Sequence, residues 1–82
     1  MYKAKIYIAP KKSVLDPQGR AVHHALESLG FQGLDEVRVG KFVELKVDSP
    51  DKTTAAARVK EMCEGLLVNA VVEEYTFELL EE

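Results

Sequence analysis

Near the middle of the 82-residue chain lies the stretch Val37-Arg38-Val39-Gly40-Lys41-Phe42-Val43-Glu44-Leu45-Lys46-Val47. Apolar and polar residues alternate on both sides of its glycine, which is typical of strands with one buried face. The stretch therefore predicts a β-hairpin in which Gly40 is free to adopt a positive φ. A three-residue turn over 40–42 would pair Val39 with Val43, whereas a two-residue turn would place Val37 opposite Glu44. A single strand bent at the glycine is the alternative.

Strand and helix patterns flank this stretch on both sides. Residues 2–8 and 71–80 alternate between apolar and polar side chains, so each segment predicts a strand. In residues 16–29 and in a second segment that ends near residue 68, apolar residues recur every three or four positions. That spacing predicts two amphipathic helices, one on each side of the hairpin.

The expected ends of the helices carry their own signals. The side chain of Asp16 can accept hydrogen bonds from the free amides of the first helical turn, and Pro17 occupies a position where no N–H donor is needed. The first helix is therefore expected to begin at these two residues. Gly30 supplies a left-handed end, and Ser49 or Asp51 caps the second helix. The stripe of the second helix that we expect to be buried consists of Ala55, Val59, Met62, Cys63, Leu66 and Leu67.

The predicted order of elements is β-α-β-β-α-β within a single domain, residues 1–82. This order corresponds to an α+β, two-layer, ferredoxin-like fold, with a four-stranded antiparallel sheet and both helices on one face. The other face would be bare and would mix apolar with charged side chains, which a lone monomer has little reason to display. The residues expected on it are Lys3, Lys5, Tyr7, Arg38, Phe42, Glu44, Lys46, Val72, Thr76 and Leu80.

Size and charge exclude several classes of protein. The chain has 11 Lys and Arg against 14 Asp and Glu, and this net charge of −3 argues against a nucleic-acid binder. No apolar run approaches the ~20 residues of a membrane span. The single cysteine cannot form an internal disulfide and the N-terminus leads into a strand pattern, so we expect a cytoplasmic address. A chain of this size buries only ~60% of its unfolded surface, which favours help from a partner chain.

The residue types that most often carry chemistry are isolated here. His23 and His24 are adjacent on the first predicted helix, point ~100° apart and cannot chelate one ion together. Cys63 lies on an apolar stripe and is expected to be a buried structural thiol. Gly40-Lys41 lacks the further glycines and the following helix of a phosphate loop. The sequence therefore predicts no catalytic residue, cofactor site or metal site in this chain.

Four stretches together resemble the PurS family, the small subunits of the bacterial and archaeal phosphoribosylformylglycinamidine (FGAM) synthase complex. The Leu-Asp-Pro-Gln-Gly and Val-Arg-Val-Gly-Lys segments, at this separation in a chain of this length, are the distinctive part. The similar stretches are Tyr2-Lys3-Ala4-Lys5-Ile6-Tyr7-Ile8, Val14-Leu15-Asp16-Pro17-Gln18-Gly19, Val37-Arg38-Val39-Gly40-Lys41 and Met62-Cys63-Glu64-Gly65-Leu66-Leu67-Val68-Asn69.

The resemblance implies a non-catalytic adaptor that assembles as a homodimer or homotetramer. In that family the complex is a ligase of purine biosynthesis, which uses ATP and glutamine to convert formylglycinamide ribonucleotide (FGAR) to formylglycinamidine ribonucleotide (FGAM). Chemistry belongs to a PurQ glutaminase and a PurL synthetase, so ATP, Mg and glutamine are expected on those partners and no cofactor on this chain. The small subunit would bridge the two and support ammonia transfer.

The resemblance also suggests which residues make contacts. We expect copies of the chain to associate through the bare face of the sheet, by way of Tyr7, Phe42, Val72 and Leu80. The larger partners are expected to bind the loop and the turn that carry the two distinctive motifs, through Leu15, Asp16, Gln18, Gly19, Arg38, Gly40 and Lys41. Each motif also has a purely structural interpretation, because a helix cap and a chain turn would explain it fully.

A protein of another class would also fit the architecture. It is a free-standing oligomeric regulatory module that binds a small metabolite between subunits. Such a module would hold its ligand without any large partner, which distinguishes it from an adaptor.

Overall fold

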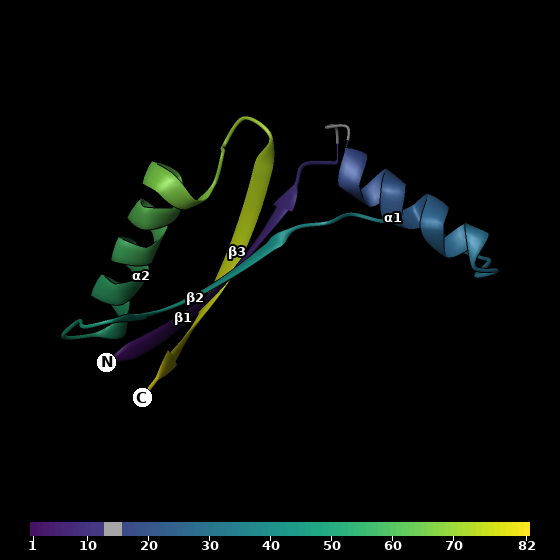
Figure 1. The fold of residues 1–82 in the computed structure, drawn as a ribbon. Helices are drawn as coiled ribbons and strands as arrows, with labels where there is room; N and C mark the ends of the chain where they lie inside the picture. Colours follow the sequence, from purple (N-terminus) through teal and green to yellow (C-terminus); the bar gives the residue numbers. More distant parts are fainter. Residues whose placement is uncertain (13–15) are drawn as a thin grey trace.

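The computed structural model describes residues 1–12 and 16–82, which form one antiparallel sheet and two helices (Figure 1). The strands are β1 (Tyr2–Pro10), β2 (Lys41–Val47) and β3 (Glu73–Glu81), in the order β2-β1-β3. Helix α1 (Pro17–Ser28) links β1 to β2, and α2 (Lys52–Met62) continues into a π-helix, η1 (Cys63–Leu67), before β3. The α+β class and the antiparallel sheet are confirmed.

The predicted hairpin is wrong, and the sheet has three strands in the described residues rather than four. Residues 37–40 belong neither to a hairpin arm nor to a bent continuation of β2, which begins at Lys41. The amide of Val39 donates to the Asp16 carboxylate at 2.9 Å instead of to a strand. Gly40 does not have the positive φ expected of a turn residue. It lies so close to β1 that a methyl group would overlap the carbonyl oxygen of Ile8.

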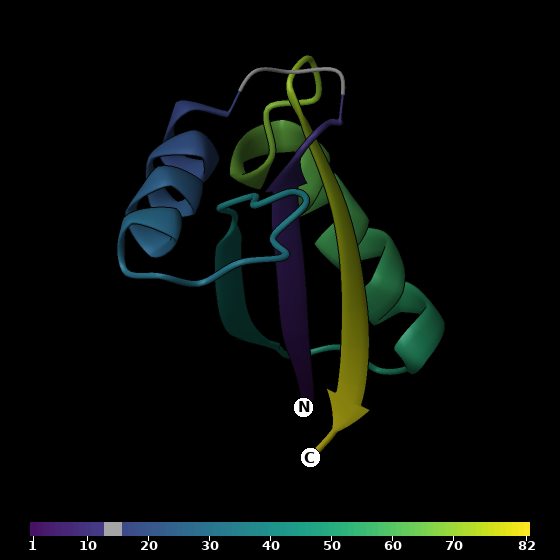
Figure 2. The ribbon, with the colours of Figure 1, turned by 90° about the vertical axis from the view of Figure 1, so that its right-hand side faces the viewer.

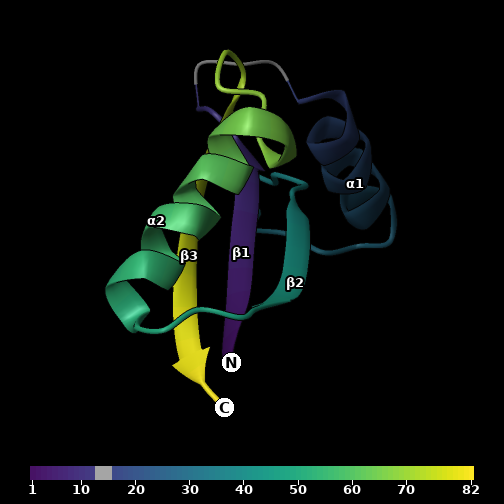
Figure 3. The same ribbon diagram turned by 90° about the vertical axis from the view of Figure 1, so that its left-hand side faces the viewer.

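The prediction that both helices cover one face of the sheet is also wrong. Helix α2 packs on β1 and β3, whereas α1 has no extensive contact with any described strand or helix and extends away from the sheet (Figures 1 and 3). Its apolar stripe is consequently open, with Val22 40% and Leu29 74% exposed. Periodicity shows that a helix has an apolar face, but it does not show which surface that face meets.

The core lies between α2 and the sheet face that α2 covers. Ala4, Ile6 and Ile8 of β1 are buried there against Val59 and Cys63, as the two periodic patterns predicted. The predicted stripe is wrong at two positions, because Met62 is 39% exposed and Leu66 is 85% exposed. Met62 is the last residue of α2. Leu66 lies in η1, where the wider winding of a π-helix shifts the angular position of side chains from that of an α-helix.

The molecule is more extended than a compact chain of its length. Its radius of gyration is 16.1 Å, against about 12 Å for a compact domain of this size. Its accessible surface is 5912 Å², against about 4,900 Å² for a compact monomer of this mass. The excess, on the order of 1,000 Å², matches what one partner contributes to a standard protein interface.

Candidate interaction site

The two distinctive motifs of the sequence meet in space. The Asp16 carboxylate, just before α1, accepts from the amide of Val39 at 2.9 Å. Gly19, in the first turn, is the buried residue of α1. A methyl group on it would overlap the carbonyl oxygen of Val37 and lie 2.6 Å from Asp16 Oδ2. We call these contacts between residues 16–19 and 37–40 the motif junction.

The Asp16 carboxylate makes its hydrogen bond at the motif junction. It makes no cap hydrogen bond to α1, so the predicted cap is not formed, although Pro17 does begin the helix and the amides of the first turn still act on the carboxylate. The pKa of Asp16 is lowered chiefly by the Val39 amide, and further by the Gly19 and Gln18 amides and the charge of Arg38. The carboxylate therefore fastens residues 37–40 to the start of α1.

Among the described elements, no helix packs extensively on the sheet face opposite α2 (Figure 2). We call it the open face, and it carries charges of both signs. Lys3 of β1 pairs with Glu44 of β2 at 2.8 Å, which raises the pKa of Lys3 and lowers that of Glu44. The hydroxyl of Tyr7 donates to Glu78 of β3 at 3.1 Å, and this bond raises the pKa of Tyr7. The composition expected for this face is confirmed for Lys3, Lys5, Tyr7, Phe42, Glu44, Lys46, Thr76 and Leu80.

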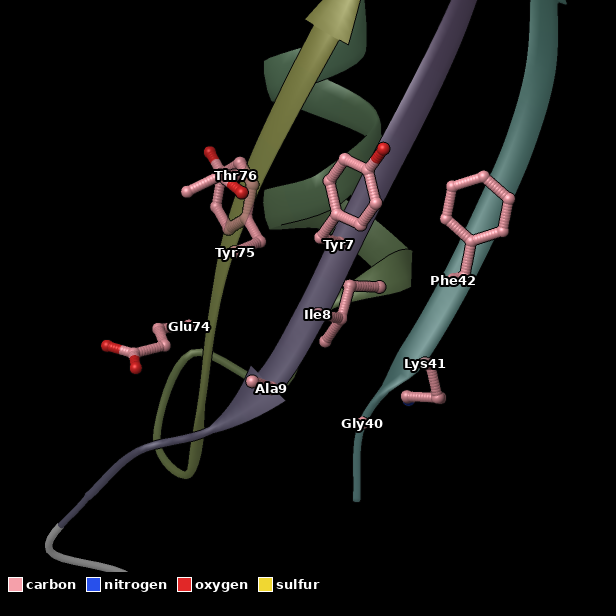
Figure 4. A pocket seen from close by; sticks show the side chains of 9 residues that line it. All are labelled: Tyr7, Ile8, Ala9, Gly40, Lys41, Phe42, Glu74, Tyr75 and Thr76. Atoms are coloured by element: carbon pink, nitrogen blue, oxygen red, sulfur yellow. The ribbon is translucent and has the colours of Figure 1, made fainter. Parts of the chain in front are cut away.

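One end of the open face is hollowed next to the motif junction (Figure 4). The rings of Tyr7 and Phe42 lie side by side there, with their centroids 5.3 Å apart. They are 45% and 53% exposed. Next to the rings lie two small residues, Ala9 on β1 and Gly40 just before β2, which do not fill the hollow (Figure 4). The hollow has a volume of about 630 Å³ and is lined by Tyr7, Ile8, Ala9, Gly40, Lys41, Phe42, Glu74, Tyr75 and Thr76.

Two ion pairs tie the region around Gly40 to the start of β3. Arg38 meets Glu74 at 3.2 Å, and Lys41 meets Glu73 at 3.3 Å. The pKa of Glu73 is lowered chiefly by the amide of Asn69 and then by Lys41. The two cations that the sequence assigned to a partner therefore already have acidic neighbours within the chain.

The structure brings together most of the residues predicted as contacts, but not all. Gly40, Lys41, Tyr7 and Phe42 share the hollow, with Asp16, Gly19 and Arg38 beside it at the motif junction. Gln18 is exposed on α1, and Leu80, 42% exposed, lies on the open face toward the other end of β3. Val72 precedes β3, where its carbonyl accepts from the amide of Lys11 at 2.9 Å. Leu15 lies outside the described residues.

Sequence reasoning missed Ala9 and Glu74 as site residues. Alternation in the last strand already placed Glu74 on the open face, but the register that sets it opposite Ala9 is a long-range property. A small residue beside two aromatic ones on adjacent strands was the only signal of the hollow. That signal depends on knowing which strands are neighbours.

The residues that could carry chemistry remain apart in the part of the chain that the structure describes. No three His, Cys, Asp or Glu side chains gather as metal ligands there. Cys63 is fully buried, and burial raises the pKa of its thiol, so the expected structural thiol is confirmed. His23 lies 3.5 Å from Glu27 one turn along α1. No described helix is long and apolar enough to cross a membrane.

Comparisons with known proteins agree over almost the whole chain. The profile of the family described as "PurS: Phosphoribosylformylglycinamidine (FGAM) synthase" matches residues 3–81. "Phosphoribosylformylglycinamidine synthase subunit PurS" of Bacillus subtilis is 49% identical over 81 residues, which are 99% of this chain and 95% of that protein. The protein of the same name from Synechocystis is 45% identical over 78 residues, 95% of this chain and 78% of that one.

Solved structures show the same similarity. The structure of B. subtilis PurS has a TM-score of 0.86 at 49% identity and covers 99% of this chain and 100% of its own. A chain in the structure of PurLQS from Thermotoga maritima has a TM-score of 0.88 at 35% identity and covers 96% of each chain.

Proposed function

Because the chain belongs to the PurS family of FGAM synthase subunits, we propose that it is the non-catalytic adaptor of that glutamine-dependent ligase of purine biosynthesis. In this proposal it bridges a PurQ-type glutaminase and a PurL-type synthetase and supports the transfer of ammonia between them. ATP, Mg and glutamine would bind to these larger subunits. The T. maritima relative, whose structure is described as PurLQS, supports this choice of partners. The cytoplasmic address stays a prediction.

The observation that carries the proposal is the amount of surface that the chain leaves uncovered. About 1,000 Å² more surface is accessible than in a compact monomer, and α1 projects from the sheet with its apolar stripe open. The open face adds two adjacent aromatic rings, 45% and 53% exposed. Aromatic side chains of this kind are enriched in protein interfaces. Such surfaces suit a chain whose role is to bind other chains.

We assign self-association to the open face, through Tyr7, Phe42 and Leu80 with the neighbouring Val72. The rings supply apolar area, and the surrounding ion pairs form a polar rim. The motif junction borders this face through Gly40 and carries the exposed Gln18 on α1. That position leaves it available to the larger subunits while the open face is occupied.

Reconstitution tests the adaptor role. The glutaminase and the synthetase are assayed with and without this chain, using either glutamine or free ammonia as the nitrogen donor. We expect turnover with glutamine to depend on the chain and turnover with ammonia to persist without it. Full glutamine-dependent activity in its absence, or turnover by the purified chain alone, would contradict the proposal.

Arg38 offers a sharper test of the contact residues, because its partner within the chain provides a matched control. Arg38→Ala and Glu74→Ala both break the same 3.2 Å ion pair. If Arg38 binds a larger subunit, only the arginine variant weakens assembly with that subunit. Equal effects of the two variants would show that Arg38 acts only within the chain.

The hollow also allows a test of the alternative function, a regulatory module that binds a small metabolite. Its volume of about 630 Å³ lies within the ~300–1,000 Å³ typical of small-molecule sites. A ligand present at 100 times its dissociation constant would stabilise the chain by about 2.7 kcal/mol. A thermal-shift screen of the purified chain with amino acids and nucleotides would detect such a ligand, and a stabilising hit without large subunits would favour this alternative.

A further inference from the structure

A second pocket lies at the end of the sheet, where the chain leaves η1, turns, and enters β3 (Figure 1). We call it the turn pocket. Its volume of about 270 Å³ is just below the ~300–1,000 Å³ of sites for drug-sized ligands. Its apolar lining comes from Val68, Ala70 and Tyr75. The turn pocket therefore has room for a molecule smaller than a typical cofactor.

The turn that forms one wall of this pocket is held by hydrogen bonds within the chain. The carbonyl oxygen of Asn69 accepts from the amides of Val72 and Glu73, at 3.0 and 2.7 Å. The side chain of Glu73 accepts in return from the amide of Asn69 at 2.8 Å. The amide of Lys11, just after β1, donates to the carbonyl oxygen of Val72 at 2.9 Å. The wall is thus formed without a ligand, which lowers the cost of binding one.

Four charged side chains line the turn pocket, and two of them are neutralised by cations from elsewhere in the chain. Glu73 pairs with Lys41 at 3.3 Å, and Glu74 pairs with Arg38 at 3.2 Å. The remaining two charges have opposite signs. They decide what the pocket can bind.

These two charges belong to Lys11 and Glu64, and neither forms an ion pair with another residue of the described chain. Each is bound by a neutral group instead. Lys11 Nζ donates to the carbonyl oxygen of Ala70 at 2.7 Å, and the hydroxyl of Tyr75 donates to Glu64 Oε2 at 3.1 Å. An ammonium group has three donors and a carboxylate about four acceptor sites, so both keep hydrogen-bonding capacity. The pocket thus offers a cation and an anion beside an apolar wall.

We propose that the turn pocket binds a small α-amino acid with an uncharged side chain. The carboxylate of the ligand pairs with Lys11, its ammonium group pairs with Glu64, and its side chain lies against Val68 and Ala70. A zwitterion fits because it supplies a partner to both protein charges, whereas a singly charged ligand leaves one of them without a partner. This site goes beyond the adaptor role, and it requires neither a second copy nor a larger subunit.

Titration of the isolated, isotope-labelled chain with L-norvaline tests the site, with the NMR shifts of backbone amides as the readout. We expect saturable shifts at Lys11, at Glu64 and in residues 68–75. A dissociation constant on the order of 1 mM or weaker is expected for so small a ligand. Pentanoate lacks the ammonium group and butylamine lacks the carboxylate. Each should bind at least about tenfold more weakly than norvaline.

Matched variants test the roles of the two charges. Lys11→Met and Glu64→Gln keep the size of the side chain and remove its charge, so each should weaken norvaline binding about tenfold. Lys12→Met and Glu61→Gln make the same changes at exposed residues outside the pocket, and both should bind as wild type does. Lys11→Arg keeps the charge and should keep most of the binding, which separates a loss of charge from a disturbance of the turn.

Several results would overturn the proposal. They are the absence of saturable shifts with norvaline, equal binding of pentanoate or butylamine, and unchanged binding in both Lys11→Met and Glu64→Gln. Shifts centred on Tyr7 and Phe42 would place the ligand in the hollow of the open face instead.

The outcome is independent of the adaptor role, because every measurement uses the isolated chain. Binding can fail while reconstitution of the complex succeeds, and the reverse. A hit in the thermal-shift screen that Lys11→Met abolishes belongs to the turn pocket. Such a hit does not favour the regulatory module, whose ligand lies between subunits.

Discussion

Gly19→Ala tests whether the motif junction holds α1 in place. In an ordinary helix this change stabilises by up to ~1 kcal/mol, because alanine is the better helix former. At Gly19 the new methyl group would overlap the Val37 carbonyl oxygen and lie 2.6 Å from Asp16 Oδ2. The distance to Asp16 Oδ2 is roughly 1 Å shorter than an ordinary van der Waals contact. Residues 37–39 must therefore move, and the Asp16–Val39 hydrogen bond moves with them.

The clash outweighs the gain in helix propensity. Overpacking against backbone costs about 1–3 kcal/mol, so we expect Gly19→Ala to lose about 1–2 kcal/mol net. For a domain of this size the midpoint of thermal unfolding would fall by roughly 5–15 °C. Urea and thermal unfolding measure the change. Gly65→Ala is the matched control, because nothing lies within 4 Å of the methyl position there, and it is expected to be neutral or mildly stabilising.

The sign of the difference decides the outcome. If Gly19→Ala were as stable as Gly65→Ala, the close approach of residues 37–39 to α1 would not exist in solution. The motif junction would then not hold α1 in place. If both variants lost stability equally, the cause would be helix chemistry rather than the clash.

Three further changes test other parts of the structure. Since the pKa of Asp16 is lowered on folding, its carboxylate contributes stability that is present above the unfolded pKa of about 4 and lost as pH falls through the folded value. The free energy of unfolding of Asp16→Asn, measured with urea, should therefore be lower than that of wild type near pH 7, and the two values should converge near pH 2–3. A difference that is independent of pH would contradict this. The double variant Tyr7→Ser, Phe42→Ser should sediment with a lower mass than wild type and keep its helix content, because the two exposed rings are removed. An unchanged mass would show that the open face does not mediate self-association. Ile6→Ala should lower the free energy of unfolding in urea by about 2–5 kcal/mol, because Ile6 is fully buried. Leu66→Ser should change it by no more than ~0.5 kcal/mol, because Leu66 is exposed. A large loss of stability in Leu66→Ser would show that Leu66 belongs to the core.

Local patterns predicted the elements that depend on neighbouring residues. Alternation in residues 2–8 and 71–80 identified β1 and β3 and the faces of their side chains. Gly30, with φ of 97°, ends α1 as the sequence predicted. These features follow from backbone geometry within a few residues, which a sequence shows directly.

The errors concern partners that are distant in the sequence. Alternation at Val37 and Val39 predicted a strand, but a carboxylate 23 residues away takes the Val39 amide. The apolar stripe of α1 predicted packing on its own sheet, where the structure leaves it exposed. Both motifs have a structural role at the junction, and the sequence could not show that they meet. The hollow depends likewise on a strand order that no local signal encodes.

The proposed function requires another polypeptide to cover the surface that this chain leaves open. Sedimentation equilibrium of the purified chain at micromolar concentration addresses it directly. The prediction is a mass that is a multiple of the 9.2 kDa of one chain. A stable 9.2 kDa species throughout that range, folded and without larger partners, would contradict it.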